Sequence, residues 1–357
     1  MRATELYPDE HFWVDHYDFF YHRGYQLRPR YRPGHVSSRK RGQKRPWFEL
    51  DQFEDEIATR WTSVLDAVRL TDGSTVVLRR THTWTDEIPI HLYLAHLTPK
   101  DERNHVVPVL DIITFPETDE VAFLVLPLLH LYYDPAFTRP IQATQALQQF
   151  FEAMQFLHEH DIAHRDFCRL NLMMDASELI PGGFHFVAAT MTPDGLTYGL
   201  NYLDRADVSP VRYFVIDLGL ASHFPSRRLN GSDCLVTGVY GQDKTVPELS
   251  WEKPYDPFKV DIYQLGRVIL EDMIEEYADL AFLRPLAESM TQQDPSLRPD
   301  ACTAVTMLKE LVNAQDSDAL QQPMPQPYSQ SGLIFTPRPP ERCCEFFCSC
   351  EGRTSES

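Results

Sequence analysis

A short run of polar residues between two apolar segments constrains the fold of this chain more than any other feature. His164-Arg165-Asp166 is followed, five positions after the aspartate, by Asn171. The apolar pair Ile162-Ala163 precedes this run and Leu172-Met173-Met174 follows it, as expected for two short buried strands. The spacing therefore predicts a tight loop, braced by two strands, that directs the carboxylate of Asp166 and the amide of Asn171 into one cleft.

A second carboxylate follows another apolar run. Asp217 comes directly after the residues YFVI (213–216) and precedes Leu218-Gly219. Carboxylate and amide oxygens are ligands that suit Mg²⁺, and an aspartate within reach of a hydroxyl can take its proton. One base, Asp166, and two metal ligands, Asn171 and Asp217, are the residue types that ATP-dependent phosphoryl transfer requires.

Three further segments follow in order. They are Val246-Pro247-Glu248, Asp261–Gly266 (DIYQLG) and Asp294–Pro299 (DPSLRP). Together with the HRD and DLG segments, they resemble the ordered motifs of protein kinases, which include H-R-D-x-x-x-x-N and D-F-G. The chain is identified as a member of the protein-kinase-like superfamily. The phrases RGYQLRPRYRPG, RNHVVPVLD, AHRDFCRLNLMMD and DKTVPE also resemble the kinase-domain proteins of mushroom-forming fungi, over nearly the whole chain outside its tail.

The resemblance implies an α+β, two-lobed fold that holds ATP and Mg²⁺ between a small β-rich lobe and a large helical lobe. The implied organisation is a basic and aromatic, irregular extension (1–45), the small lobe (46–128), the large lobe (129–315) with an insert at about 176–210, and a flexible Pro/Gln/Ser linker with a disordered Cys-rich tail (316–357).

The resemblance also implies roles for individual residues. His164, Arg165, Asp166 and Asn171 form the catalytic set, and Asn171 and Asp217 bind the metal. Val64, Val77 and Met173 line the adenine pocket, Leu126 lies at the hinge, and Arg79, with Glu87 as its partner, contacts the phosphates. In the kinase pattern, Asp261 supports the catalytic loop and Glu248 pairs with Arg298.

Local patterns predict mainly strands before residue 128 and helices after it. The predicted strands are Val64–Arg69, Thr75–Arg80, Val106–Phe115 and Val121–Leu126, with a hairpin turn at Asp72-Gly73 and one helix at Asp86–Leu97. The predicted helices are Ile262–Ile274, Cys302–Val312 and one with a buried stripe of Leu147, Phe150, Phe151, Met154 and Leu157. The run RGYQLRPRYRPG (23–34) is rich in Pro and Gly and predicts an irregular segment.

The predicted phosphate-binding half departs from the family pattern. Arg79 stands where the family has a lysine, and a long, forked guanidinium is not interchangeable with an ammonium group. Ile57, Thr59 and Thr62 stand at the positions of three glycines, and without glycine the backbone cannot easily approach a phosphate. These departures favour weak or absent ATP turnover.

Other departures concern single side chains and one insertion. Glu87 lies only eight positions after Arg79, so it is either the partner of Arg79 or a surface residue at a helix start. Cys168 replaces the lysine typical of Ser/Thr kinases, with Arg169 beside it as another cation. The 46-residue separation of Asn171 and Asp217 predicts a turn-rich surface excursion beside the cleft.

Three functions remain open. The first is ATP- and Mg²⁺-dependent phosphoryl transfer to Ser or Thr hydroxyls of a protein, catalysed by a protein kinase that is attenuated by its small lobe. The second is a pseudokinase that acts as a scaffold or regulatory binding module, which the altered small lobe favours. The third, a small-molecule phosphotransferase, is disfavoured by the Glu248 and Arg298 segments, which organise a peptide-binding surface in the kinase pattern.

Charge and hydropathy restrict the partners. The net charge is −19, from 33 basic and 52 acidic residues, which argues against nucleic acid or an anionic membrane as the main partner and leaves a protein substrate or signalling partner. The apolar run Val121–Leu129 is too short to span a bilayer, and the first residues lack a signal-peptide pattern. We expect an intracellular, cytoplasmic protein with reduced cysteines; Ser38–Arg45 leaves nuclear import open.

The tail and the predicted activation segment carry modifiable residues. The cysteines Cys343, Cys344, Cys348 and Cys350 flank two phenylalanines in a spacing that fits zinc poorly. They predict either weak lipid anchoring by S-acylation or an inert tail. The hydroxyl residues of the predicted activation segment are Ser222, Ser226, Ser232 and Thr237.

Overall fold

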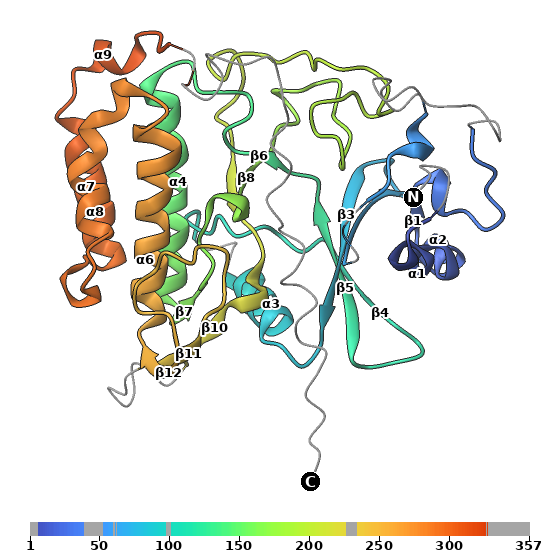
Figure 1. Cartoon of the computed structure of the whole chain (residues 1–357). Helices are drawn as coiled ribbons and strands as arrows, with labels where there is room; N and C mark the ends of the chain where they lie inside the picture. The colour runs from blue at the N-terminus through green and yellow to red at the C-terminus, as the bar shows by residue number, and fades with distance from the viewer. Residues whose placement is uncertain are drawn as a thin grey trace.

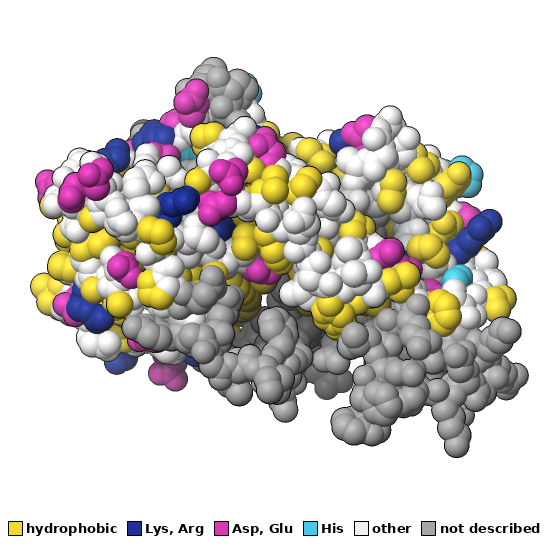
Figure 2. Space-filling view, turned by 90° about the horizontal axis from the view of Figure 1, so that it is seen from above, with side chains coloured by type: hydrophobic (Ala, Val, Ile, Leu, Met, Phe, Trp, Pro, Cys, Tyr) yellow, Lys and Arg dark blue, Asp and Glu magenta, His cyan; other side chains and the backbone are white. Residues whose placement is uncertain are grey.

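The computed structural model describes residues 6–38, 53–59, 61, 63–97, 101–225, 234–325 and 327. The structure is mixed α/β, with an antiparallel sheet on one side and most of the helices on the other (Figure 1). Among the described helices, none combines the length and the apolar character needed to cross a bilayer. Among the side chains coloured on the face in Figure 2, acidic groups are interspersed with hydrophobic and basic ones.

A curled antiparallel sheet of five strands dominates the first part of the described chain (Figure 1). Its order is β1 (Tyr25–Leu27), β2 (Val64–Arg69), β3 (Thr75–His82), β5 (Val121–Pro127) and β4 (Asp111–Thr114). β2 and β3 join at the predicted hairpin, where Gly73 has a φ of 74°, a left-handed conformation that glycine adopts at little cost. In the register, Val64 lies opposite Arg79 and Val77 opposite Leu126. The predictions of β2, β3 and β5 are confirmed, as is the helix that follows β3, α3 (Glu87–Leu97).

The predicted strand Val106–Phe115 is shorter than expected. β4 covers only its end, whereas Val106 forms an isolated bridge with Val215 and the Val107 N–H donates to the Val215 carbonyl (3.0 Å). Pro108 follows, and it has no N–H with which to continue a ladder. The first residues of the predicted strand therefore tie the sheet to the segment that contains Val215.

Short helices near the N-terminus cover one face of the sheet. After η1 (Pro8–Glu10), α1 (His11–Asp15) and α2 (Tyr17–His22) place the rings of Trp13 and Phe20 at 5.8 and 5.0 Å from the ring of Phe123 in β5. The prediction of an irregular extension is wrong for these helices and for β1, which lies within the Pro- and Gly-rich run. Burial of large aromatic side chains against the sheet outweighs the weak local propensity. Residues 39–45 lie outside the described residues.

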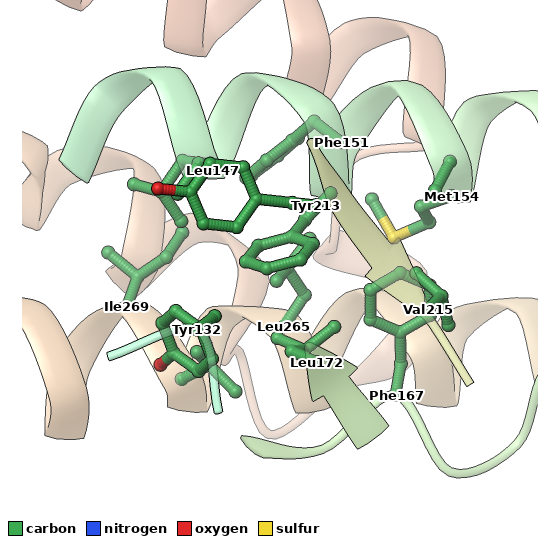
Figure 3. Close-up of a cluster of buried hydrophobic side chains, with 14 of the residues drawn as sticks. Tyr132, Leu147, Phe151, Met154, Phe167, Leu172, Tyr213, Val215, Leu265 and Ile269 are labelled. Atoms are coloured by element: carbon green, nitrogen blue, oxygen red, sulfur yellow. The ribbon is translucent and has the colours of Figure 1, made fainter. Parts of the chain in front are cut away.

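Helices build the second part of the described chain. They are α4 (Pro140–Glu159), α6 (Pro257–Val268), the π-helical η7 (Ile269–Ile274), η8 (Ala278–Leu283), α7 (Arg284–Met290), η9 (Pro295–Leu297), α8 (Ala301–Asn313) and α9 (Ser317–Gln321). Figure 3 shows Leu147, Phe151 and Met154 of α4 in the same buried cluster as Val215 and Leu265. The predicted stripe on α4 and the predicted helix at 302–312 are confirmed. The predicted helix at 262–274 is also present, but its second half is π-helical.

Short strands frame the predicted loop. β6 (His130–Leu131), β8 (Leu172–Met174) and β9 (Tyr213–Val215) form one small sheet; β7 (Ile162–Ala163) pairs with β10 (Ser222–His223), and β11 (Val236–Gly238) with β12 (Ser250–Tyr255). The loop therefore runs from β7 to β8 through the short helix η5 (Arg169–Asn171), as the two apolar segments predicted.

The predicted insert at 176–210 is turn-rich but packed. Ile180 and Met191 are buried, and the buried guanidinium of Arg205 donates to the carbonyl of Tyr132 (2.9 Å). These contacts hold the insert against the helical part of the molecule.

The predicted linker begins with packed residues. α9 is followed by Met324, which is buried and whose N–H donates to the Thr138 carbonyl (2.8 Å). The prediction of a flexible linker from residue 316 is therefore wrong as far as Met324. Residues 328–357, which include the cysteine-rich tail, lie outside the described residues.

Candidate active site

The loop between β7 and β8 is held in shape by helix α6. Asp261 is fully buried, and its carboxylate accepts hydrogen bonds from the backbone N–H groups of His164 (2.8 Å) and Arg165 (2.7 Å). Arg165 has a φ of 67°, a strained conformation for a residue with a side chain. One turn further along α6, Gln264 accepts a hydrogen bond from the Phe167 N–H (2.7 Å). Buried side chains of α6 therefore fix the backbone of the loop, and the expected support by Asp261 is present.

Asp166 and Asn171 meet inside this loop. The Asn171 side-chain N–H donates to Asp166 Oδ2 (3.0 Å) and to the Asp166 carbonyl (2.8 Å). The other carboxylate oxygen, Oδ1, accepts from the backbone N–H of Gln242 (2.8 Å). Burial raises the pKa of Asp166, and the hydrogen bond from Gln242 opposes that rise. The carboxylate is therefore oriented by neighbours on both sides and is a better proton acceptor than an exposed aspartate.

Asp217 lies next to the loop because two contacts join the preceding residue, Ile216, to the loop. The Ile216 N–H donates to the Asn171 carbonyl (2.9 Å), and His164 Nε2 lies 3.0 Å from the Ile216 carbonyl. Asp217 has a φ of 65°, and its Oδ1 accepts from the Gly219 N–H (3.1 Å) at the start of η6 (Leu218–Leu220). The structure thus brings the predicted residues His164, Asn171 and Asp217 together.

A buried ion-pair network links Asp217 to the sheet. Arg79 Nη2 donates to Asp217 Oδ1 (2.5 Å), and Arg79 Nε donates to Glu87 Oε1 (2.8 Å). Glu87 Oε2 accepts from the hydroxyl of Thr81 (2.5 Å). Burial lowers the pKa of Arg79, but the charges of Asp217 and Glu87 outweigh burial, so the pKa is raised. Of the two alternatives for Glu87, the buried partner of Arg79 is the one observed.

His91 is a buried neighbour of this network and was not predicted from the sequence. It is buried one turn after Glu87 on α3, and burial together with the charge of Arg79 lowers its pKa to about 4. The ring is therefore neutral at physiological pH. The four-residue spacing from Glu87, which places both side chains on one helix face, is the signal that could have found it.

Two of the three residues expected to line an adenine pocket, Val77 and Met173, share one apolar cluster with the expected hinge residue Leu126. Val77 and Met173 pack against Leu126 and Phe214 at the junction of β3, β5, β8 and β9. Val64 is not part of this cluster in the described structure; it lies opposite Arg79 in the register of β2 and β3.

The segment expected to replace a glycine-rich loop is held from two sides. In η3 (Glu54–Glu56), Glu54 Oε1 accepts from Arg28 Nε (2.5 Å), and the Ile57 carbonyl accepts from Arg28 Nη2 (2.6 Å). The insert meets the same segment: the Phe186 and Trp61 rings are 5.4 Å apart. Glycine is absent at Ile57 and Thr59, as the sequence states, and Ile57 is buried. Thr62 lies outside the described residues.

The predicted pair Glu248–Arg298 forms a two-pronged ion pair of 2.5 and 2.9 Å, in which Arg298 is almost fully buried.

Arg169, expected as another cation near Asp166, is directed elsewhere: its guanidinium lies 4.0 Å from the centre of the Tyr133 ring and 3.4 Å from Asp272.

One cavity of the described structure has a volume of about 550 Å³. It is lined by Tyr93, Asp101, Arg103, Glu159, His160, Asp161, His223 and Pro225. None of the predicted catalytic, cofactor-binding or metal-binding residues is among them.

No family model matches the chain, and no curated protein matches its sequence.

Several predicted residues, namely Ser226, Ser232, Cys343, Cys344, Cys348 and Cys350, lie outside the described residues.

Proposed function

We propose that the chain has a two-lobed protein-kinase-like fold and catalyses phosphoryl transfer from ATP to Ser or Thr hydroxyls of a protein. The observation that carries this proposal is the convergence of Asp166, Asn171 and Asp217, joined by the hydrogen bonds of Asn171 to Asp166 and to Ile216. The three side chains supply one buried carboxylate with a raised pKa (Asp166), one amide (Asn171) and a second carboxylate (Asp217) in neighbouring loops.

Asn171 and Asp217 fit a magnesium ion. Both offer hard oxygen ligands, and Mg²⁺ usually takes one or two protein oxygens and completes its shell with water and phosphate oxygens. Within the described residues no cluster of three or more His, Cys, Asp or Glu side chains could hold a metal, so Asn171 and Asp217 would hold the ion only together with water and phosphate oxygens. The ion would neutralise charge on the nucleotide phosphates.

In the proposed reaction, Asp166 acts on the acceptor hydroxyl. The hydroxyl oxygen forms a bond to the γ-phosphorus of ATP while the bond from that phosphorus to the β,γ-bridging oxygen breaks, and its electron pair leaves with ADP. The hydroxyl proton passes to Asp166, whose raised pKa makes it a stronger base. The contacts from Gln242 and Asn171 hold the carboxylate in one orientation, which reduces the entropy cost of the step.

A second candidate is a pseudokinase that serves as a binding module. It is favoured by the ion pair between Arg79 and Asp217, which occupies one oxygen of the proposed metal ligand, and by the packing of Ile57 where the backbone would need to approach phosphate.

The test is a thermal-shift titration with ATP and Mg²⁺, followed by a transfer assay on a mixture of protein substrates. Under the first proposal, the wild type is stabilised by Mg·ATP and transfers phosphate, and Asp166→Ala loses transfer. If wild type shows neither effect while Arg79→Lys gains both, the pseudokinase is the correct assignment. Equal transfer by Asp166→Ala and wild type would overturn the catalytic role of this site.

A further inference from the structure

Phosphoryl transfer at Asp166 needs a cation close to the acceptor side. The transferring group carries negative charge, which spreads over its oxygens in the transition state, and Asp166 adds a further negative charge. A fixed positive group beside the transferring phosphoryl stabilises that state.

The arginines around the loop are directed to other partners. Arg165 donates to the Ser222 hydroxyl (3.1 Å), and its guanidinium lies over the ring of Tyr240. Arg169 faces Tyr133 and Asp272, and Arg79 is bonded to Glu87 and Asp217. Cys168, at the position of the family's lysine, supplies no positive charge: burial raises the pKa of its thiol well above the usual value.

A turn from another part of the chain approaches Asp166 and carries a lysine. Gly241 has a φ of 81°, and a Cβ there would lie 3.1 Å from Asp166 Oδ1, so the turn comes this close only because the residue is glycine. The next residue, Gln242, donates its N–H to the same oxygen (2.8 Å). Lys244 Nζ donates to the Val239 carbonyl (3.0 Å), which folds the lysine back over the turn.

The surroundings of Lys244 leave its side chain accessible while the neighbouring backbone is held in place. The side chain is exposed, whereas Val246, two residues later, is buried and anchors the segment. Partial burial lowers the pKa of Lys244, and the carboxylate of Asp166 acts in the opposite direction. The two charges therefore interact across the turn.

We infer that Lys244 is the positive group that faces the transferring phosphoryl at Asp166, taking the place of the cation that the loop itself lacks at Cys168. This inference rests on the proposed function. It assigns to the turn at 239–244 both the orientation of the base, through Gln242, and the charge that offsets the phosphoryl group.

The experiment compares Lys244→Met, Lys244→Arg and a control, Lys253→Met, whose lysine is exposed on β12. Two quantities are measured: kcat for transfer, and the affinity for Mg·ADP with and without tetrafluoroaluminate, a mimic of the transferring phosphoryl. We expect Lys244→Met to lower kcat roughly 100-fold and to weaken the affinity for Mg·ADP with tetrafluoroaluminate by at least about tenfold. Its affinity for Mg·ADP alone should stay within about twofold, because only the complex with the mimic carries the charge that Lys244 would face.

Lys244→Arg should retain most of the wild-type kcat and most of the affinity for Mg·ADP with tetrafluoroaluminate, because it keeps the positive charge. Lys253→Met should match the wild type in both quantities. If the wild type transfers phosphate and Lys244→Met retains both its kcat and its affinity for the mimic, the inference about Lys244 is overturned while the proposed function stands. If the wild type neither transfers phosphate nor binds Mg·ADP more tightly with tetrafluoroaluminate, the proposed function fails and the role of Lys244 fails with it.

Discussion

Arg79 Nη2 donates a 2.5 Å hydrogen bond to Asp217 Oδ1 across 138 positions of sequence. The same guanidinium holds Glu87 through its Nε (2.8 Å), so one side chain of β3 joins helix α3 to the segment after β9. The charge of Asp217 is thereby balanced within the protein. A magnesium ion would have to share this carboxylate with Arg79 or displace it, and the strength of the Arg79–Asp217 pair therefore sets how readily the proposed site takes a metal.

Removal of the guanidinium should destabilise the fold. Arg79→Met leaves Glu87 and Asp217 buried without their common partner, which should lower the free energy of unfolding by about 3 kcal/mol. Arg80→Met is the matched control on the same strand, because Arg80 lies over the ring of Phe12 (5.3 Å) and such a contact contributes less than about 1 kcal/mol when it is partly exposed. Urea unfolding followed by circular dichroism measures both. Equal losses in the two variants would show that the network is not a stabilising centre.

The geometry of the network also depends on Gly219. A Cβ at this position would lie 2.9 Å from Arg79 Nη2 and 3.0 Å from Asp217 Oδ1. We expect Gly219→Ala to push the two groups apart and to lower the free energy of unfolding by about 1–3 kcal/mol. Gly182→Ala is the control, since a Cβ there meets no atom within 4 Å. The same urea titration decides: a Gly219→Ala protein as stable as the control would mean that Arg79 moves aside without cost.

Much of the loop could be predicted because its signals are local. The apolar segments on either side of His164–Asn171 predicted β7 and β8, because they adjoin the loop directly. The contacts of Asp261 and Glu248 join distant positions, and they were expected only because the later segments resemble kinase motifs.

The remaining features depend on contacts between distant segments. The two helices before β1 are stabilised because Trp13 and Phe20 pack against Phe123, which lies more than 100 positions later. The local content of Pro and Gly carries no information about this long-range contact. Similarly, Gly241 and Lys244 come to Asp166 through the fold of the β11–β12 region, where neither spacing nor residue type marks them. The kinase resemblance placed Val64 in the adenine pocket, but Val64 lies opposite Arg79 in the register of β2 and β3 and is not part of the apolar cluster.

Buried His91 should make stability depend on pH. Burial lowers its pKa to about 4 in the folded protein, whereas in the unfolded chain a histidine titrates near 6.5. Between these values the unfolded state binds the extra proton, so the contribution of neutral His91 is complete above about pH 6.5 and is lost as the pH falls toward 4.

Replacement of His91 should remove that dependence. In His91→Gln, the fall in the free energy of unfolding between pH 6.5 and 4 should be smaller than in wild type, by at most about 3 kcal/mol. The comparison cancels the contribution of Asp166, whose raised pKa acts in the opposite direction. His96→Gln, at an exposed position of the same helix, serves as the control and should follow the wild type. Parallel pH curves for His91→Gln and wild type would contradict the prediction.

Arg28 should fix the segment that was expected in place of a glycine-rich loop. Its buried guanidinium bonds to the Glu54 carboxylate and the Ile57 carbonyl. Burial raises the pKa of Glu54, but His185 and Arg28 together outweigh that effect and hold the pKa below its usual value, so Glu54 is charged in the folded protein. Arg28→Met removes the main counter-charge and should lower the free energy of unfolding by about 3 kcal/mol.

A double-mutant cycle separates this ion pair from simple loss of packing. If Arg28 and Glu54 interact as the distances indicate, Arg28→Met with Glu54→Gln should cost at least about 1 kcal/mol less than the sum of the two single changes. Cleavage after Glu54 and Glu56 by a glutamate-specific protease should become faster in Arg28→Met, because the segment loses its anchor, and should stay unchanged in Arg32→Met, where the arginine is exposed. Additive energies together with unchanged cleavage would show that Arg28 does not anchor the segment. The segment would then be held by its other contacts, among them the hydrogen bond from Arg30 Nη1 to the Asp55 carbonyl (2.5 Å) and the packing of Trp61 against Phe186.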